Sequence, residues 1–289
     1  MAPSRDRWLE RFESLVARKV QLATSVTLPP YATELEDPEK DAVAIGNAWS
    51  KELFDGPFYL SPRPTTRLLP TCSLVFVQSA GGNTCATDPG LLGGGHTDKH
   101  LIYEGLSRVA ADAVLAGAAT VRGSEIVFSV WHPELVKLRA SLGLPRHPVQ
   151  IVATIRGLDL DEALLFNVPD IPVLLLTVPE AARQMRDALE ARPWVTPLLM
   201  TGSHDLPRVF ERLPSMGIGR LSCVGGRTLA GHLLDARLVD DVYLTTGLGA
   251  GGDPHTPLFS TPWRGRVAVR KGGSGVENGV VFEHYSRGA

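Results

Sequence analysis

Long apolar runs that alternate with helix-like segments restrict the fold of this chain more than any other feature. The runs PVQIVATI, IPVLLLT and RLSCV are nearly continuous in hydrophobic and β-branched residues. Strands of this composition are buried on both faces, whereas a strand with one face in water alternates apolar and polar residues. Segments such as PEAARQMRDALEA and LPRVFERLPSMG separate the runs and have the spacing of helices. The sequence therefore predicts an α/β fold with a mostly parallel sheet flanked by helices.

The two ends of the chain depart from this alternation. At the C-terminus, RVAVRKGGSGVENGVVFEHYS carries hairpin-type Gly and Asn-Gly signals, which predict antiparallel strands and hence a mixed sheet. At the N-terminus, Trp8, Phe12, Leu15 and Val16 have the spacing of an amphipathic helix over the first ~25 residues. Residues 26–70 are rich in proline, acids and aromatics. We expect residues 1–69 to form an N-terminal helix and an extended arm, and residues 70–289 to form the main domain.

Composition limits the class of function. A hydrophobic content of 44% and a charged content of 21% are typical of a soluble globular protein. The net charge of -2 gives no reason to expect a nucleic acid or a membrane surface as partner. The start of the chain lacks the apolar core of a signal peptide, and the three cysteines are far apart. We therefore expect a cytoplasmic protein without disulfides.

A Gly-Gly pair between a strand and a helix is the first candidate for a binding site. In CVGGRTLAGHLLDARLVDDVYLTT, Gly225 and Gly226 follow an apolar strand and precede a segment with helical leucine spacing. Glycine lets a ligand approach the backbone, and the unpaired N–H groups at a helix start suit a phosphate. The alternative is a plain structural turn.

Two further strand ends carry suitable residues. LAGAATVRG is another strand-to-helix junction, and VATIRG ends in Thr154 and Arg156. Ligands bind at the carboxyl ends of the strands of a parallel sheet, so the three junctions converge on one site. Arg156 has the chemistry to bind the ribose 2′-phosphate that distinguishes NADP from NAD. Its alternative is a solvated surface position.

Other motifs in the sequence do not predict a cofactor or metal site. The glycines of GLGAGG lead into DPHTPLF and not into a helix, so they do not predict a Rossmann site. His96 and His100 lie four residues apart without the glutamate of a zinc-protease motif, which favours a surface or capping role over a metal. Thr97 is expected to cap the helix that begins with DKHLIYEGLSRVA.

The segments DAVLAGAATVRGSE, IVATIRG and CVGGRTLAGHLLDARLVDDVYLT, followed by GGDPHTPLF, resemble the reductase domain of the riboflavin-biosynthesis protein RibD. The resemblance covers about residues 70–287. It implies a dihydrofolate reductase-like three-layer fold, usually dimeric, that binds NADPH. The hydride of NADPH reduces the ribose of a ribosylaminopyrimidine phosphate in this pyrimidine reductase family. The resemblance places the following residues at the cofactor: Gly117, Thr120, Val121, Thr154, Ile155, Arg156, Val224, Gly225, Gly226, Arg227 and Thr228.

The substrate side departs from the family. Where the family has an S-x-D-G-K motif, this chain has the segment from Ser79 to Asn83, which carries neither of the two charges. Where the family has an acidic A-D-D-P motif, this chain has one carboxylate, Glu125, at a shifted position. The glutamate that usually precedes the Gly-Gly pair is Val224. Arg108 keeps an anchor for an anionic substrate, so the substrate candidates are Ser79, Asn83, Arg108 and Glu125. No proton donor stands out among Ser79, Asn83 and Glu125.

Two functions follow from this pattern. The first is an NADPH-dependent oxidoreductase, a homodimer acting on the riboflavin-pathway substrate or on a less polar carbonyl, imine or pterin-like compound. A site that loses its polar partners no longer discriminates in favour of a polyhydroxylated substrate. The second is a catalytically inactive protein that binds NADP(H) as a sensor or partner.

Overall fold

A ten-stranded mixed sheet forms the centre of the computed structural model, which describes residues 5–63, 69–122, 125–259, 263, 265–272 and 275–287. Its order is β1-β11-β12-β10-β4-β9-β5-β6-β7-β8. The block from β10 to β8 is parallel, and β12, β11 and β1 add antiparallel strands at one side. The predicted mixed, mostly parallel sheet is confirmed. The strands are β1 (Tyr31–Glu36), β4 (Thr71–Gln78), β5 (Ala113–Gly117), β6 (Val149–Ala153), β7 (Val173–Thr177), β8 (Val195–Leu199), β9 (Arg220–Cys223), β10 (Asp241–Thr246), β11 (Arg266–Gly272) and β12 (Val281–Ser286), with β2 (Val43–Ile45) and β3 (Phe58–Leu60) forming a small separate ribbon.

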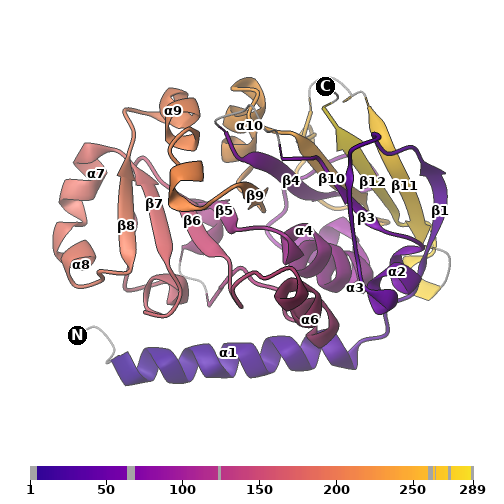
Figure 1. Cartoon of the computed structure of the whole chain (residues 1–289), viewed down its shortest axis with the longest axis horizontal. Helices are drawn as coiled ribbons and strands as arrows, with labels where there is room; N and C mark the ends of the chain where they lie inside the picture. Colours follow the sequence, from indigo (N-terminus) through magenta and orange to yellow (C-terminus); the bar gives the residue numbers. More distant parts are fainter. Residues whose placement is uncertain are drawn as a thin grey trace.

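Helices cover both faces of the sheet (Figure 1). The α-helices are α1 (Arg5–Ser25), α2 (Ala48–Phe54), α3 (Gly95–Thr97), α4 (Ser107–Val109), α5 (Ala118–Val121), α6 (Pro133–Ser141), α7 (Pro179–Gln184), α8 (Arg186–Glu190), α9 (Leu206–Phe210) and α10 (Arg227–Asp235). A π-helical section, η2 (Asp98–Leu106), joins α3 to α4, and short 3-10 turns are η1 (Pro89–Leu92), η3 (Leu164–Phe166), η4 (Ser203–Asp205), η5 (Pro214–Met216) and η6 (Gly275–Glu277).

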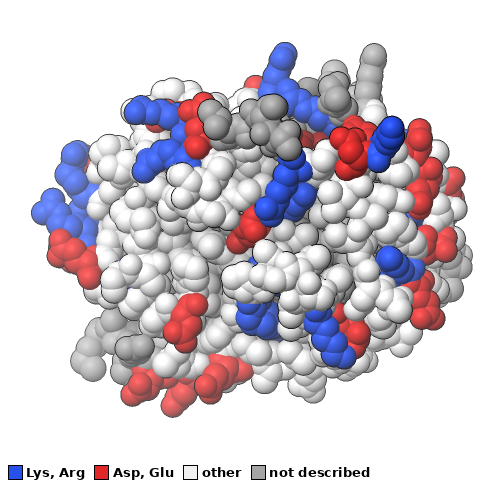
Figure 2. Space-filling model, viewed as in Figure 1, with Lys and Arg blue, Asp and Glu red and all other residues white. Residues whose placement is uncertain are grey.

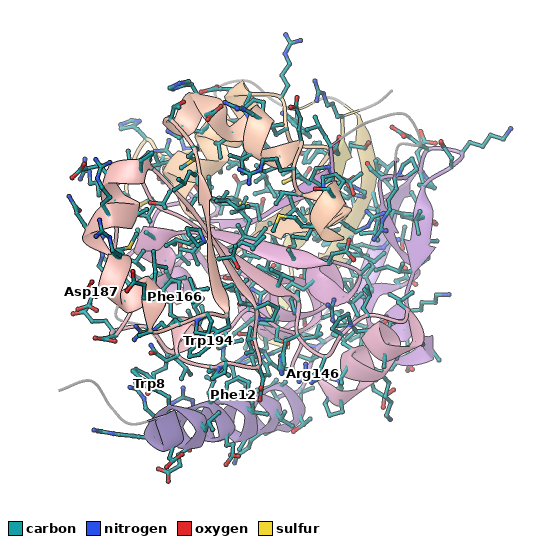
Figure 3. All side chains as sticks on the ribbon, turned by 60° about the vertical axis from the view of Figure 1, so that its left-hand side comes forward. Trp8, Phe12, Arg146, Phe166, Asp187 and Trp194 are labelled. Atoms are coloured by element: carbon teal, nitrogen blue, oxygen red, sulfur yellow. The ribbon has the colours of Figure 1, made fainter. Side chains whose placement is uncertain are left out.

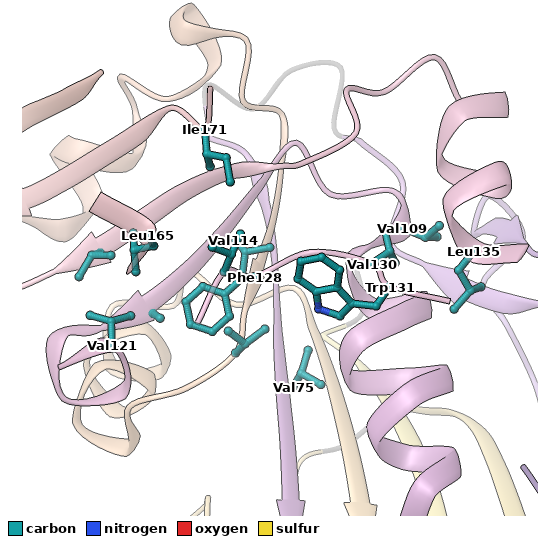
Figure 4. Close-up of a cluster of buried hydrophobic side chains, with 14 of the residues drawn as sticks. Val75, Val109, Val114, Val121, Phe128, Val130, Trp131, Leu135, Leu165 and Ile171 are labelled. Atoms are coloured by element: carbon teal, nitrogen blue, oxygen red, sulfur yellow. The ribbon is translucent and has the colours of Figure 1, made fainter. Parts of the chain in front are cut away.

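The side chains of the parallel strands enter two separate cores because successive residues point to opposite faces. In β5, Val114 and Ala116 pack on the face covered by α1, α6 and η2, whereas Ala113 and Leu115 pack on the face covered by α9 and α10. Figure 4 shows the first of these cores around β5, with Phe128 and Trp131 among its large side chains. This double burial is the physical reason for the continuous apolar runs.

The N-terminal segment joins the body at two places. Helix α1 buries Trp8, Leu15 and Ala23 in the first core, and Trp8 and Phe12 rise from the helix toward the body (Figure 3). Strand β1 pairs with β11 and so extends the sheet by one strand. The predicted N-terminal amphipathic helix is confirmed, since α1 spans Arg5–Ser25.

The helix after β4 differs from its prediction. It begins at Gly95, two residues before the expected cap, and the Thr97 side chain makes no capping hydrogen bond. The Thr97 hydroxyl instead donates to the carbonyl oxygen of Pro29 at 3.1 Å. The expectation that Thr97 caps this helix is therefore wrong, because a carboxylate from another part of the chain receives the helix N–H groups, as described below.

The surface carries charges of both signs. Acidic and basic side chains lie among one another on the face that Figure 2 shows. Within the described ranges, no helix combines the length and the hydropathy needed to cross a bilayer.

Candidate functional site at the carboxyl ends of the strands

The ends of β5 and β9 are hydrogen-bonded to each other. The N–H of Gly117 donates to the carbonyl oxygen of Gly225 at 3.1 Å, and the N–H of Val224 donates to that of Leu115 at 3.0 Å. β6 pairs with the other side of β5. The three predicted junctions therefore lie next to one another at one edge of the sheet.

Gly225 and Gly226 adopt backbone conformations that other residues rarely take, with φ of 150° and 84°. They lead into α10, where no side chain caps the first turn. The N–H groups at the start of a helix lack intrahelical partners and carry a partial positive charge. Arg227 and Thr228 open this helix and are exposed, and the Arg227 guanidinium donates to the carbonyl oxygen of Pro257 at 3.2 Å. The turn thus presents bare backbone and a cation to solvent.

Helix α5 faces this turn from the end of β5. A Cβ atom on Gly225 would lie 3.4 Å from the hydroxyl oxygen of Thr120, so the hydroxyl is directly beside the glycine turn. Val121, in contrast, is fully buried, and its side chain belongs to the core in Figure 4. Thr120 can therefore contact a ligand through its side chain, while Val121 fixes α5 on the sheet.

The end of β6 combines a fixed residue with two exposed ones. Thr154 is buried, and its hydroxyl donates to the carbonyl oxygen of Gly157 at 3.1 Å. Ile155 is 53% exposed. Arg156 is also exposed and forms no ion pair with any residue that the structure describes. An apolar surface beside a free guanidinium suits an adenosine that carries a phosphate.

These residues fit a phosphorylated dinucleotide. At the uncapped start of α10 the two glycines leave the backbone without side chains, and a Cβ at Gly226 would lie 3.4 Å from Gly117 Cα. Arg156 lies two strands away, at the end of β6. A dinucleotide lying across the edge would then place its adenosine over β6 and its diphosphate over β9.

The turn after β4 uses its polar groups internally. Ser79 is fully buried and its Oγ accepts from the N–H of Asn83 at 3.3 Å, while Asn83 Oδ1 accepts from the N–H of Thr256 at 3.2 Å. The N–H of Ala80 donates to the carbonyl oxygen of Gly249 at 2.9 Å. Ser79 and Asn83 thus tie the turn to the segment after β10.

Glu125 is paired with the N-terminal helix. The Arg11 guanidinium lies 2.8 Å and the Arg18 guanidinium 3.5 Å from its carboxylate, and the Glu125 side chain is 43% exposed. The neighbouring residues 123 and 124 of the same segment lie outside the described residues. These contacts hold Glu125 against α1.

Arg108 lies buried beside the glycine turn. Its guanidinium stacks on the ring of Tyr103 at 4.2 Å, and the Tyr103 hydroxyl lies 3.5 Å from the carbonyl oxygen of Val224. One nitrogen of Arg108 donates to the carbonyl oxygen of Ser129 at 3.3 Å, whereas Nε and Nη2 have no hydrogen-bond partner among the described residues. A buried donor without a partner costs free energy, so these two nitrogens are the atoms of Arg108 that lack an acceptor within the described chain.

Two buried acidic residues at the carboxyl ends of the strands were not predicted from the sequence. Asp98 and Glu277 are both buried, and the hydroxyl of Tyr31 is buried near them without a hydrogen-bond partner in the described chain. Burial raises the pKa of Asp98 to about 7; a hydrogen bond from Thr245 opposes this rise and the charge of Glu277 adds to it. No motif links these residues, which come from β1, η2, β10 and η6. In the sequence, Asp98 is simply an acidic residue near the start of a helix, a position that is usually on the surface. The sequence therefore gives no sign that Asp98 is buried.

His96 and His100 lie close together, with ring centroids 6.1 Å apart. His100 Nδ1 lies 3.4 Å from the buried carboxylate of Glu104. Within the described residues, no three His, Cys, Asp or Glu side chains gather as a metal site.

The fold is that of an α/β protein whose three strand-to-turn junctions meet at the carboxyl ends of its parallel strands, the place where such sheets bind ligands. The chain belongs to the family of the RibD C-terminal domain, which matches residues 91–260. This membership supports an oxidoreductase and confirms the resemblance recognised in the sequence.

Solved structures of two proteins show the same fold. A pyrimidine reductase-like protein from Corynebacterium diphtheriae superposes with a TM-score of 0.60 at 22% identity, covering 75% of this chain and 91% of the other. RibD from Acinetobacter baumannii gives a TM-score of 0.56 at 16% identity, covering 76% of this chain and 58% of that protein. This chain therefore spans little more than half of the Acinetobacter protein. The comparison with curated proteins finds no match.

Proposed function

We propose that this protein is an NADPH-dependent reductase of the RibD C-terminal type. The observation that carries the proposal is the hydrogen bond from Gly117 to Gly225, which brings the two glycine junctions into one cradle beside Arg156. When bound, NADPH supplies a hydride to an electrophilic carbon. The residues of this chain hold the cofactor: the start of α10 receives the diphosphate, and Arg156 receives the 2′-phosphate.

The substrate in this proposal differs from the ribosylaminopyrimidine phosphate of the pyrimidine reductases. Val224 makes the wall next to the cofactor apolar, and Ser79 and Asn83 are engaged in their own turn. Arg108 offers two unpaired donors to an acceptor on the substrate. A carbonyl, imine or pterin-like compound with few hydroxyl groups suits such a pocket.

The proposal extends to organisation. Residues 70–289 form the reductase domain, and residues 1–69 form a helix and an arm, of which α1 packs on one face of the sheet and β1 extends the sheet at its side. We place the enzyme in the cytoplasm as a homodimer, in keeping with the family resemblance and with cysteines that stay free. Light scattering on the purified chain measures the oligomeric state.

The first experiment is a titration of the purified protein with NADPH and with NADH, followed by nicotinamide fluorescence. A charge-assisted contact to a phosphate contributes about 1.5–3 kcal/mol. Arg156→Ala should therefore weaken NADPH binding by roughly 10- to 100-fold and leave NADH binding unchanged. Arg7→Ala, which removes an exposed arginine on α1, far from the three junctions in sequence, is the matched control. Failure of the parent protein to bind either nucleotide would contradict the proposal.

The second candidate function is an inactive NADP(H)-binding sensor or partner. The observation that favours it is that Ser79 and Asn83 use their polar groups within the turn after β4 and on the segment after β10. A panel of carbonyl, cyclic imine and pterin compounds, monitored by loss of NADPH absorbance, separates the two functions. Tight NADPH binding without oxidation on any compound favours the sensor.

A further inference from the structure

The acid cluster lies on the side of the glycine turn where the reactive end of a dinucleotide would be. Gly225 follows β9, and the next strands in the sheet are β4 and then β10, which carries Thr245. Neighbouring strands are about 4.8 Å apart, so the end of β10 lies roughly 10 Å from the end of β9. Arg156 is on the opposite side of β9. A cofactor with its adenosine phosphate at Arg156 therefore extends its nicotinamide toward β4 and β10.

Two carboxyl groups and one phenol meet at this place. Glu277 accepts hydrogen bonds from the N–H of His96 at 2.6 Å and from the N–H of Thr97 at 3.2 Å. These donors stand in the first turn of the helix that carries Asp98, so they hold the Glu277 side chain at the start of that helix. Asp98 is 9% exposed and receives a hydrogen bond from the Thr245 hydroxyl. The Glu277 carboxylate is thus fixed beside Asp98.

The surroundings of Asp98 favour its neutral form. Glu277 and Tyr31 face it from η6 and β1, and Tyr103 interacts with it from its own helix. No lysine or arginine forms an ion pair with Asp98 or Glu277 in the described ranges of the chain. Two buried carboxyl groups without a cation cannot both ionise readily, and Glu277 holds the backbone donors. The proton therefore resides on Asp98.

We propose that Asp98 is the proton donor of the reduction, and that Glu277 is a positioning residue that keeps Asp98 protonated. The inference rests on the proposed reductase function and supplies the acid that the sequence did not identify. The small exposed fraction of Asp98 is the surface through which a substrate would reach it. Tyr31, contributed by the N-terminal arm, is buried and interacts with both carboxyl groups.

The step balances as follows. A carbon of a C=N or C=O bond takes the hydride, which comes from the reduced nicotinamide as that ring is oxidised. The π electrons of the bond move to the nitrogen or oxygen, and this atom takes the proton as the Oδ–H bond of Asp98 breaks. Asp98 is left as a carboxylate and regains a proton from water.

The test measures the protonation of Asp98 in the NADPH-bound protein by infrared spectroscopy. The parent should show the carbonyl stretch of a protonated carboxylic acid near neutral pH, and Asp98→Asn should lack this band. Glu277→Gln should shift the titration of the band to lower pH. Glu162→Gln, which alters an exposed carboxylate, should leave the band unchanged. Absence of the band from the parent at neutral pH would overturn the proposal.

Turnover provides the second readout, on whichever compound of the panel the parent reduces. Asp98→Asn should lower kcat about 100-fold or more without weakening NADPH binding, as expected for loss of an acid catalyst. The parent rate should fall as the pH rises through about 7, and Glu277→Gln should move this fall to lower pH. Parent-like turnover in Asp98→Asn refutes the donor role and leaves the reductase function intact. Failure of the parent to bind NADPH refutes both.

Discussion

The backbone N–H of Gly117 donates a 3.1 Å hydrogen bond to the carbonyl oxygen of Gly225, which joins the turn after β5 to the turn after β9. The two segments are far apart in the chain, yet their turns form one surface. Glycine is required on the β9 side of this contact, where Gly225 and Gly226 have φ of 150° and 84°, whereas Gly117 has an ordinary φ of -78° and room for a Cβ atom.

Gly226→Ala should damage both the turn and cofactor binding. Gly226 has a φ of 84°, and its Cβ would lie 3.4 Å from Gly117 Cα. Strain of this kind costs about 1–3 kcal/mol, and we expect NADPH affinity to fall at least about tenfold. Gly231→Ala is the control, because Gly231 lies inside α10 with open space around it and alanine there stabilises a helix by up to about 1 kcal/mol. Urea unfolding and NADPH titration measure the two effects; equal behaviour of the variants would count against the cradle.

Arg139→Met should destabilise the fold strongly. The Arg139 guanidinium is buried and donates to the main-chain carbonyl oxygens of Arg108, Val109 and Ala111. Removing it leaves several buried acceptors without a partner, for a loss of about 3 kcal/mol in the free energy of unfolding. Lys137→Met, on the same helix, removes a side chain that is 71% exposed and should change stability by less than about 0.5 kcal/mol. Denaturant unfolding of both variants gives the comparison, and a small effect at Arg139 would contradict the assignment.

His147 should make the protein sensitive to mild acid. Burial lowers the pKa of His147 to about 4, with further contributions from Arg146 and Arg139. Below about pH 6.5 the imidazole of His147 is protonated in the unfolded chain, whereas in the folded protein it stays neutral down to about pH 4. The free energy of unfolding therefore falls as the pH drops from about 6.5 to about 4. Partial exposure limits the effect to about 1–2 kcal/mol.

His147→Asn should flatten this part of the stability profile. His204→Asn, which replaces an exposed imidazole, should leave the slope as in the parent. Thermal or urea unfolding across pH 4–7 measures the slope. An unchanged slope in His147→Asn would show that another group is responsible.

Leu15→Ala tests whether the N-terminal helix is part of the folding unit. Leu15 is 1% exposed and packs in the core beneath α1, so its truncation should cost about 2–4 kcal/mol. Leu22→Ala, on the same helix, truncates a side chain that is 41% exposed and should cost less than about 1 kcal/mol. A single unfolding transition that shifts in Leu15→Ala supports one cooperative unit. If the main transition stays in place, α1 contributes little to the stability of the domain.

Much of the architecture follows from patterns within short stretches of sequence. The run IPVLLLT predicts β7, and the leucine spacing after Gly226 predicts α10, because backbone geometry alone sets the periods of strands and helices. The convergence of three junctions also follows, since parallel strands bring their carboxyl ends to one edge. Thr97 failed as a cap because the helix begins two residues earlier, at Gly95, and its first-turn N–H groups, that of Thr97 included, donate to Glu277, which is distant in sequence.

The sequence by itself thus determined the class of fold, the family and the position of the proposed cofactor cradle, all of which depend on local periodicity and on short motifs. The tertiary structure alone decided the surroundings of the acid and of the substrate side. It placed Glu277 and Tyr31 beside Asp98, paired Glu125 with α1 and buried Arg108 under Tyr103. Such contacts join residues far apart in the chain, and burial and neighbouring charge set their protonation. The burial of these groups and the charges next to them arise only when the chain folds.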